Sequence, residues 1–219
     1  MRVPCGSFVA VTSQNGYVLY PTTVRPTGQW LEQTGGPKWW FDSGALALDF
    51  AYTGPFADQP EREYLQTAAD LAAWLDPRFE EVDGAVSDGD LRDARALRAA
   101  IANAAAAASE GSAPSPADVD MINLYAAIPD IPPALSGGTR QAGRTNARTG
   151  QALSVIAREA VQLFAADERD RIRSCAADDC SVVFYDESRS NNRRWCSMGR
   201  CGNRAKVREY RERRAAAGA

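Results

Sequence analysis

Four cysteines near the C-terminal end of the chain have the spacing of a metal site. Cys175, Cys180, Cys196 and Cys201 form the pattern C-x4-C-x15-C-x4-C. Each close pair can supply two ligands from one turn, and the insert brings the two pairs together. We therefore expect a tetrahedral site of four thiolates that holds zinc. An iron-sulfur centre is the second choice, and two disulfides would need an oxidising compartment.

The residues around the cysteines indicate how the ligands are positioned. Val182 to Tyr185 is β-branched and aromatic, which predicts a strand, and "SRSNNRR" predicts a turn. After Cys201 the stretch "GNRAKVREYRERR" has helical character, so we expect the last ligand at or near a helix start. Four thiolates around one Zn²⁺ leave a net charge of about −2, which nearby arginines can balance. The segment is too small for a core of its own, so metal binding should be required for its folding.

Charge is strongly segregated along the chain. Residues 171 to 219 hold 12 basic and 6 acidic side chains, a balance of +6, whereas the rest holds 13 and 22, a balance of −9. This asymmetry indicates a polyanion partner, and double-stranded DNA is the one that we expect. The candidate nucleic-acid-binding residues are Arg189, Arg193, Arg194, Arg200, Asn203, Arg204, Lys206, Arg208 and Arg211.

Several of these candidates have a structural alternative. Arg193 and Arg194 could neutralise the thiolates or pair with Asp186 and Glu187. Asn203 could cap the terminal helix instead of contacting a base. The two glutamates of that helix could pair with its arginines and leave a solvated helix.

Apolar residues at helical spacing predict a helical body ahead of the cysteines. The pattern becomes helical from Trp39 and continues in "PEREYLQTAADLAAWLDP". A further helix should begin at Ser115, a capping residue followed by Pro116. Two more helices are expected to bury one stripe each, formed by Leu91, Ala94, Leu97, Ile101 and Ala104 in the first and by Leu153, Ile156, Ala160, Leu163 and Phe164 in the second.

Three further features carry expectations of their own. Asn15-Gly16 between Phe8–Thr12 and Tyr17–Tyr20 predicts an N-terminal β-hairpin, with an irregular extension as the alternative. Arg92, Arg95 and Arg98 form a stripe that we expect to be a solvated helix face. The Gly-, Pro- and Arg-rich stretch 131–150 is expected to be a connector.

The composition excludes some classes of protein. The chain contains no histidine, which removes Ser-His and Cys-His nucleophile arrangements. No run of about 18 apolar residues suggests a membrane span, and no signal peptide is recognisable at the N-terminus. We therefore expect a cytoplasmic protein without membrane contact. We also expect no catalytic residues and no enzyme, although carboxylates such as Asp42 or Asp49 and tyrosines such as Tyr52 or Tyr125 leave a small-molecule enzyme as a third hypothesis.

The cysteine segment resembles a known family. "CAADDC", "FYDESRSNNRRWCSM" and the tetrad Cys201-Gly202-Asn203-Arg204 are similar to the CGNR zinc finger. In that family the finger follows a domain called ABATE, with which stress-induced transcription regulation is associated. "LALDFAYT" and "SVIAREAVQLF" resemble that domain, and the likeness covers about residue 38 to the end. The chain departs from it at Tyr52, where the family usually has Asn.

These observations predict a mainly α fold, in which a helical domain precedes a small α+β four-cysteine finger. The expected divisions are an extension or hairpin at 1–37, a helical ABATE-like domain at 38–168, the finger at 169–214 and a tail at 215–219. The resemblance and the charge pattern together imply a zinc-dependent, DNA-binding transcriptional regulator whose helical domain senses a signal or dimerises. A homodimer and a small-molecule effector stay open. The alternative is a protein-interaction module with a structural zinc site and arginines that bind an acidic partner.

Overall fold

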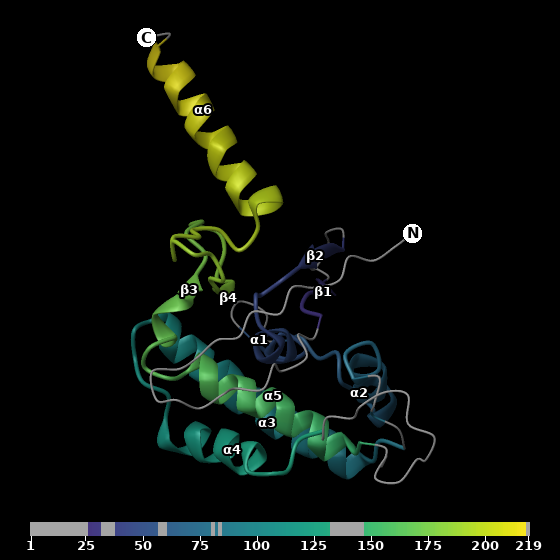
Figure 1. Ribbon diagram of the computed structural model, residues 1–219. Helices are drawn as coiled ribbons and strands as arrows, with labels where there is room; N and C mark the ends of the chain where they lie inside the picture. Colours follow the sequence, from purple (N-terminus) through teal and green to yellow (C-terminus); the bar gives the residue numbers. More distant parts are fainter. Residues whose placement is uncertain are drawn as a thin grey trace, which may run out of the picture.

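A computed structural model describes residues 26–31, 38–56, 61–79, 82, 85–131 and 147–217. The fold is mainly α, as predicted (Figure 1). The hairpin predicted around Asn15-Gly16, and most of the connector predicted at 131–150, lie outside the described residues. In chain order the helices and strands are β1 (Gln29–Leu31), β2 (Trp39–Phe41), α1 (Leu46–Ala51), α2 (Ala68–Leu75), α3 (Asp88–Ser109), α4 (Pro116–Ala126), α5 (Thr149–Leu163), η1 (Arg169–Arg171), β3 (Ile172–Ser174), β4 (Val183–Tyr185), η2 (Met198–Gly202) and α6 (Asn203–Ala217).

Helices α1 to α5 form the helical body. The long helices α3 and α5 run side by side, α4 packs against both, and α1 lies against their end nearest the cysteines (Figure 1). All six residues of α1 are buried. The two stripes predicted from helical spacing are buried too, except that Phe164 is only half-buried. The body therefore has one apolar core, to which α1 contributes all six of its residues.

Side-chain caps explain where these helices begin. Thr67 with Asp70 and Ser87 with Asp90 form reciprocal capping boxes at α2 and α3. The predicted cap at Ser115 is confirmed: its hydroxyl accepts from the Asp118 amide at 3.2 Å. Each of these caps satisfies a backbone amide that the first helical turn leaves without a partner.

The prediction that helix begins at Trp39 is wrong. Trp39–Phe41 is instead strand β2, which pairs antiparallel with β1 at Gln29–Leu31. Three successive aromatic residues suit a pleated strand better than a helix. Gly44 then adopts φ +82°, a left-handed conformation, so the chain turns before α1 starts at Leu46.

The expectation of a solvated arginine stripe on α3 is wrong for Arg98. Its guanidinium is buried and forms two 2.7 Å hydrogen bonds with the carboxylate of Glu63. A step of three residues turns back by about 60° around a helix. The stripe therefore drifts by about 120° between Arg92, which is exposed, and Arg98, which reaches the buried side.

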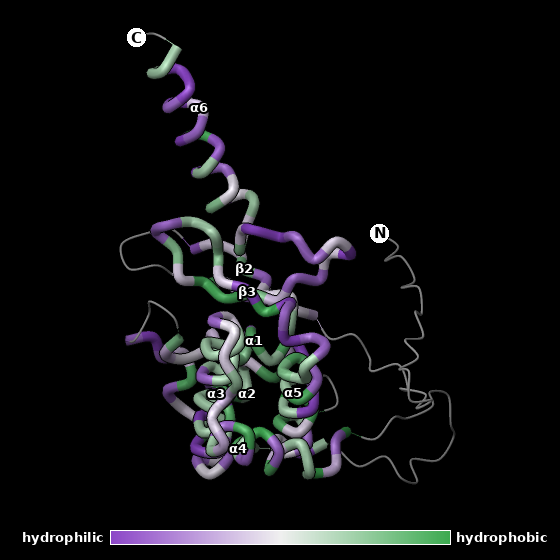
Figure 2. Tube along the Cα trace, turned by 90° about the vertical axis from the view of Figure 1, so that its left-hand side faces the viewer, coloured by the Kyte–Doolittle hydropathy of each residue, from purple (hydrophilic) through white to green (hydrophobic). Residues whose placement is uncertain are grey.

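The cysteine unit, residues 171–202, packs on the end of the helical body. The strand predicted at Val182 to Tyr185 is confirmed as β4, and it pairs antiparallel with β3, which we did not predict. Beyond this unit α6 projects away from the body in both views (Figure 1 and Figure 2). Across the described part of the chain, no helix combines the length and the apolar character that crossing a bilayer requires.

Candidate metal centre

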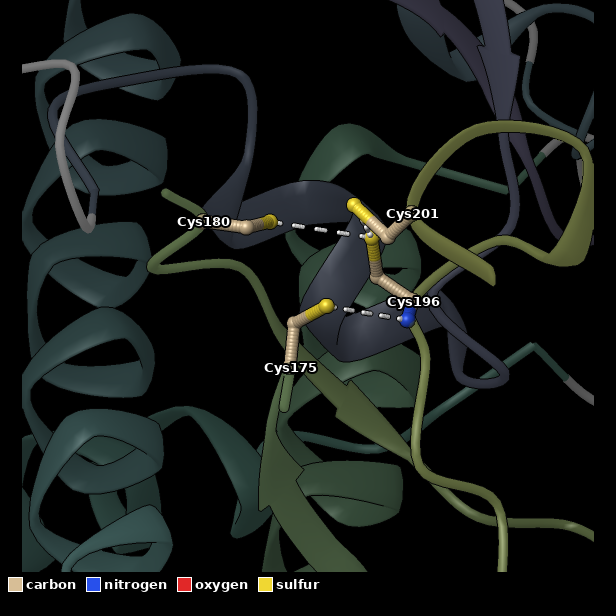
Figure 3. A group of neighbouring side chains, drawn as sticks. All are labelled: Cys175, Cys180, Cys196 and Cys201. Atoms are coloured by element: carbon tan, nitrogen blue, oxygen red, sulfur yellow. Dashed lines mark hydrogen bonds between the residues drawn. The ribbon is translucent and has the colours of Figure 1, made fainter. Parts of the chain in front are cut away.

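The four predicted cysteines converge on one point. Their sulfur atoms all lie within 4.8 Å of one another, and the side chains point toward a common centre (Figure 3). Cys180 Sγ lies 3.8 Å from Cys196 Sγ, which lies 3.6 Å from Cys201 Sγ. A tetrahedral ion with metal–sulfur bonds of about 2.3 Å requires edges of about 3.8 Å. The separations fit a bound metal ion and are far longer than a disulfide bond.

Short backbone hydrogen bonds position the first pair of ligands. Cys175 directly follows β3, and its amide donates to Val182 O at 2.8 Å, which extends the β3–β4 pairing by one residue. The amide of Ala176 donates to Arg194 O at 2.8 Å and ties this pair to the second. The amide of Cys180 closes a turn by donating to Ala177 O at 3.0 Å.

The second pair is held by a turn that leads into α6. Cys201 lies in the π-helical turn η2, two residues before α6, so the prediction of a last ligand near a helix start is confirmed. The amide of Cys196 donates to Cys175 Sγ at 3.5 Å, and Arg204 Nη2 donates to Cys201 Sγ at 3.2 Å. This bond to sulfur raises the pKa of Arg204. Donors aimed at sulfur stabilise the thiolate form that a metal requires.

The donor set indicates the kind of site. Three of the cysteines are buried and Cys180 is half-buried. Four sulfur ligands complete a tetrahedron, so such an ion keeps no position for a substrate or a water molecule. The arrangement is that of a structural metal centre.

Comparison with protein families agrees with this geometry. The family "CGNR zinc finger" matches residues 171–214. The ABATE family, described as "Putative stress-induced transcription regulator", matches residues 44–167, more than half of the chain. The chain belongs to the ABATE family. No curated protein matches the sequence.

The ABATE domain holds the cysteine unit through Tyr52. The Tyr52 hydroxyl donates to Val183 O at 2.9 Å and accepts from Val183 N at 2.8 Å, so one phenol satisfies both backbone groups of a β4 residue. Its ring is fully buried beside Phe41 and Phe56, and this burial raises the pKa of the hydroxyl. Sequence reasoning marked Tyr52 as a departure from the family pattern but missed this role, since its partner lies 131 residues away.

A second set of contacts joins the turn between β2 and α1 to the cysteine unit. Ser43 O accepts from the Tyr185 amide at 2.7 Å. Arg193 Nη2 donates to Cys196 O at 2.5 Å and to Asp42 O at 3.3 Å. A Cβ at Gly44 would lie 2.5 Å from Tyr185 O, so only glycine allows this close approach.

Asp186 orders the turn that carries Arg193. Its buried carboxylate accepts from the Ser188 amide at 2.9 Å and from the Arg193 amide at 2.7 Å. Burial works to raise the pKa of Asp186, but the hydrogen bonds from Ser188 and Arg193 hold it below its usual value. The partnership that we considered between Arg193 and Asp186 therefore exists, but through the backbone of Arg193.

Two carboxyl groups, one buried (Asp49) and one half-buried (Glu159), lie where the helical body meets the cysteine unit. Asp49 accepts from Ser43 Oγ at 2.6 Å and from the Gly28 amide, and burial raises its pKa to about 6. Glu159 reaches from α5 to accept from the Ala47 amide at the start of α1, and burial raises its pKa to about 7. Internal hydrogen bonds thus occupy Asp49 and Tyr52, two residues of our enzyme hypothesis.

The residues predicted to contact nucleic acid divide into two groups. Some are engaged inside the protein: the Arg193 guanidinium stacks on Phe184 at 4.4 Å, and that of Arg200 stacks on Trp39 at 4.5 Å. Arg194 is exposed beside the Trp195 ring. The other candidates are exposed, and all but the first lie on α6: Arg189, Asn203, Arg204, Lys206, Arg208 and Arg211.

The side chain of Asn203 does not cap α6, whereas our structural alternative supposed that it would. Asn203 is the first residue of α6. Its side-chain amide donates to Gly199 O at 3.4 Å, so its contact is with the preceding η2 turn. A capping side chain would accept from an amide of the helix.

Proposed function

We propose that the protein is a zinc-dependent, DNA-binding transcriptional regulator in which α6 contacts the duplex. Zinc is the ion that best suits four cysteine thiolates in a closed tetrahedron. The ABATE family description supports the regulatory role. The helical body then carries the sensing or dimerising function, and the metal centre fixes the base of α6.

The observation that carries this proposal is the isolation of α6. Ala205 is its only buried residue, and among the described residues its packing is essentially against η2. A helix with so little packing does not contribute to a core. Its polar character, visible in Figure 2, indicates a surface that works by charge.

The charges of α6 are separated around its axis. At about 100° per residue, Glu209 and Glu212 fall on the same side as the buried Ala205. The opposite side carries two exposed apolar residues between basic ones, and its members are Arg204, Lys206, Val207, Tyr210, Arg211 and Arg214. Arg208 lies about 60° from Ala205, beside Glu212. No ion pair among the described residues joins either glutamate to an arginine, so our alternative of a salt-bridged helix is not supported.

This basic side suits a DNA groove. Helix α6 has 15 residues and is therefore roughly 22 Å long. The major groove admits an α-helix, arginine and lysine neutralise phosphates, and small apolar groups can contact thymine methyls. Helix α6 can enter a groove without a clash with the body because it stands clear of it (Figure 1).

Binding of the zinc-loaded chain to a random-sequence duplex across a salt series tests the proposal. We expect affinity to fall with salt by a log–log slope of about −0.9 per phosphate contacted. Arg211→Ala should make that slope shallower by about 0.9. The matched control is Arg92→Ala, which removes an exposed arginine from α3 and should leave the slope unchanged. A wild-type chain that binds no duplex at low salt would contradict the proposal.

A further inference from the structure

Two ion pairs connect the first cysteine loop to the start of α6. Asp179 Oδ2 lies 2.8 Å from Arg204 Nη1, and Asp178 Oδ2 lies 3.0 Å from Arg208 Nη1. We propose that Asp178 and Asp179 compete with DNA phosphates for these two arginines and so limit the affinity of the protein for any duplex. This inference rests on the proposed DNA-binding function.

The geometry matches two carboxylates to two guanidinium groups. Arg204 and Arg208 are four residues apart on α6, so their side chains lie one above the other on one face. Asp178 and Asp179 are adjacent in the loop that ends at the metal ligand Cys180. Because the metal centre fixes both the loop and the base of α6, the two carboxylates remain beside the arginines.

Both ion pairs are at the surface and can exchange. The side chains of Asp178 and Asp179 are 81% and 63% exposed, and those of Arg208 and Arg204 are 53% and 47% exposed. Exposed pairs of this kind contribute little to stability. A phosphate can therefore displace either carboxylate, but the displaced carboxylate stays close to the phosphate and repels it.

Two other basic residues of α6 differ from these two arginines. In the part of the chain that the structure describes, no ion pair involves Lys206 or Arg211. These two residues are therefore free to contact phosphates directly, whereas Arg204 and Arg208 must first leave their carboxylates. Phosphate contacts raise affinity for all sequences alike. If two phosphate contacts are weakened, contacts to base edges make up a larger share of the binding free energy.

The test compares two variants that change the net charge equally. Asp178→Asn with Asp179→Asn removes both competitors, and Asp120→Asn with Asp167→Asn removes two exposed carboxylates far from α6 in sequence. Each zinc-loaded protein is titrated with a random-sequence duplex across a salt series, and zinc content confirms an intact centre. We expect the first variant to bind roughly threefold to tenfold more tightly and the control to change less than twofold.

A double-mutant cycle shows whether the effect passes through the arginines. In a chain that already carries Arg204→Ala and Arg208→Ala, the two Asp→Asn changes should no longer tighten binding. A first variant that binds no more tightly than the control would overturn the inference. If the wild type binds no duplex at low salt, the proposed function itself is contradicted and the inference falls with it.

Discussion

The cysteine unit and α6 are consecutive in sequence, yet different forces hold them. The cysteine unit shares one apolar cluster with the helical body, to which Ile172, Phe184 and Cys196 all belong. Helix α6 has a single buried residue, Ala205. Burial and backbone hydrogen bonds thus hold the cysteine unit in place, whereas the metal centre and surface charge determine the position of α6.

This difference shows that arginines in one basic segment have different roles. Arg193 lies in the junction and donates to the carbonyls of Trp195 and Cys196. Arg211, only 18 residues later, is exposed on α6. Composition gives both residues the same positive charge, and only their packing separates a structural arginine from one that can bind a partner.

Metal removal should cause the largest loss of stability in this series. It tests whether the cysteine unit and the helical body unfold together. Structural zinc in small finger peptides contributes apparent binding energies of about 10–16 kcal/mol. Even a loss of roughly 5 kcal/mol would lower the melting temperature by about 10–20 °C. Because the cluster is shared, we expect a chelator or Cys196→Ser to lower one cooperative transition in thermal circular dichroism. Two transitions, with that of the body unchanged, would show that the units are independent.

A pH series tests Glu159, the half-buried carboxyl group where the helical body meets the cysteine unit. The pKa of Glu159 is raised from its usual 4.5 to about 7. Between these values the folded chain retains a proton that the unfolded chain releases. The stabilisation is therefore complete below pH 4.5 and is lost as pH rises through 7, by about 3 kcal/mol.

The variant Glu159→Gln isolates this contribution. Its amide oxygen can still accept from the Ala47 amide, but it cannot ionise. We expect denaturant unfolding of this variant to show a flatter stability profile between pH 5 and 8. Exposed Glu110→Gln on the same body is the control, and its profile should match the wild type. An unchanged profile in Glu159→Gln would show that another group is responsible.

A matched pair of arginine substitutions separates the two regions directly. Arg193→Ala removes hydrogen bonds to three carbonyls and the contact with Phe184, and we expect a loss of about 2–3 kcal/mol in unfolding free energy. Arg211→Ala should change stability by less than about 0.5 kcal/mol while it weakens DNA binding. Denaturant melts and duplex titrations of both variants check the contrast. Equal losses of stability in the two variants would contradict the difference between the cysteine unit and α6.

Tyr52→Phe should have the smallest effect of the series on the junction. The change keeps the ring but leaves the amide and carbonyl of Val183 without their partner, at a cost of about 2 kcal/mol. We expect faster amide hydrogen exchange at Val183 with little change in α4, which lies away from the junction. Tyr64→Phe, on a half-exposed ring, is the control. If exchange at Val183 stayed slow, the hydroxyl would not be the link between the two regions.

The sequence was most informative where local rules apply. Helical spacing predicted the buried stripe of α3, Ser115 marked the start of α4, and the cysteine pattern predicted the four residues that converge. Short-range periodicity and ligand spacing act over a few residues, so they are readable without the fold. The predicted DNA contacts remain predictions, because only a complex would show them.

Features that depend on distant partners could not be predicted. Arg98 is buried because Glu63, in the loop before α2 and 35 residues away, neutralises it. Tyr52 contacts a backbone 131 residues away. In each case the deciding partner is far along the chain, and one side chain alone does not specify it.

The Tyr52–Val183 link has a mechanical consequence. It joins α1, at the end of the helical body, to the unit on which α6 stands, so a shift of α1 is transmitted to the base of a long helix. A tilt of about 5° at that base would move the far end of a 22 Å helix by roughly 2 Å. That displacement approaches the length of a hydrogen bond, so a small rearrangement inside the body can change which atoms of a partner the tip of α6 reaches.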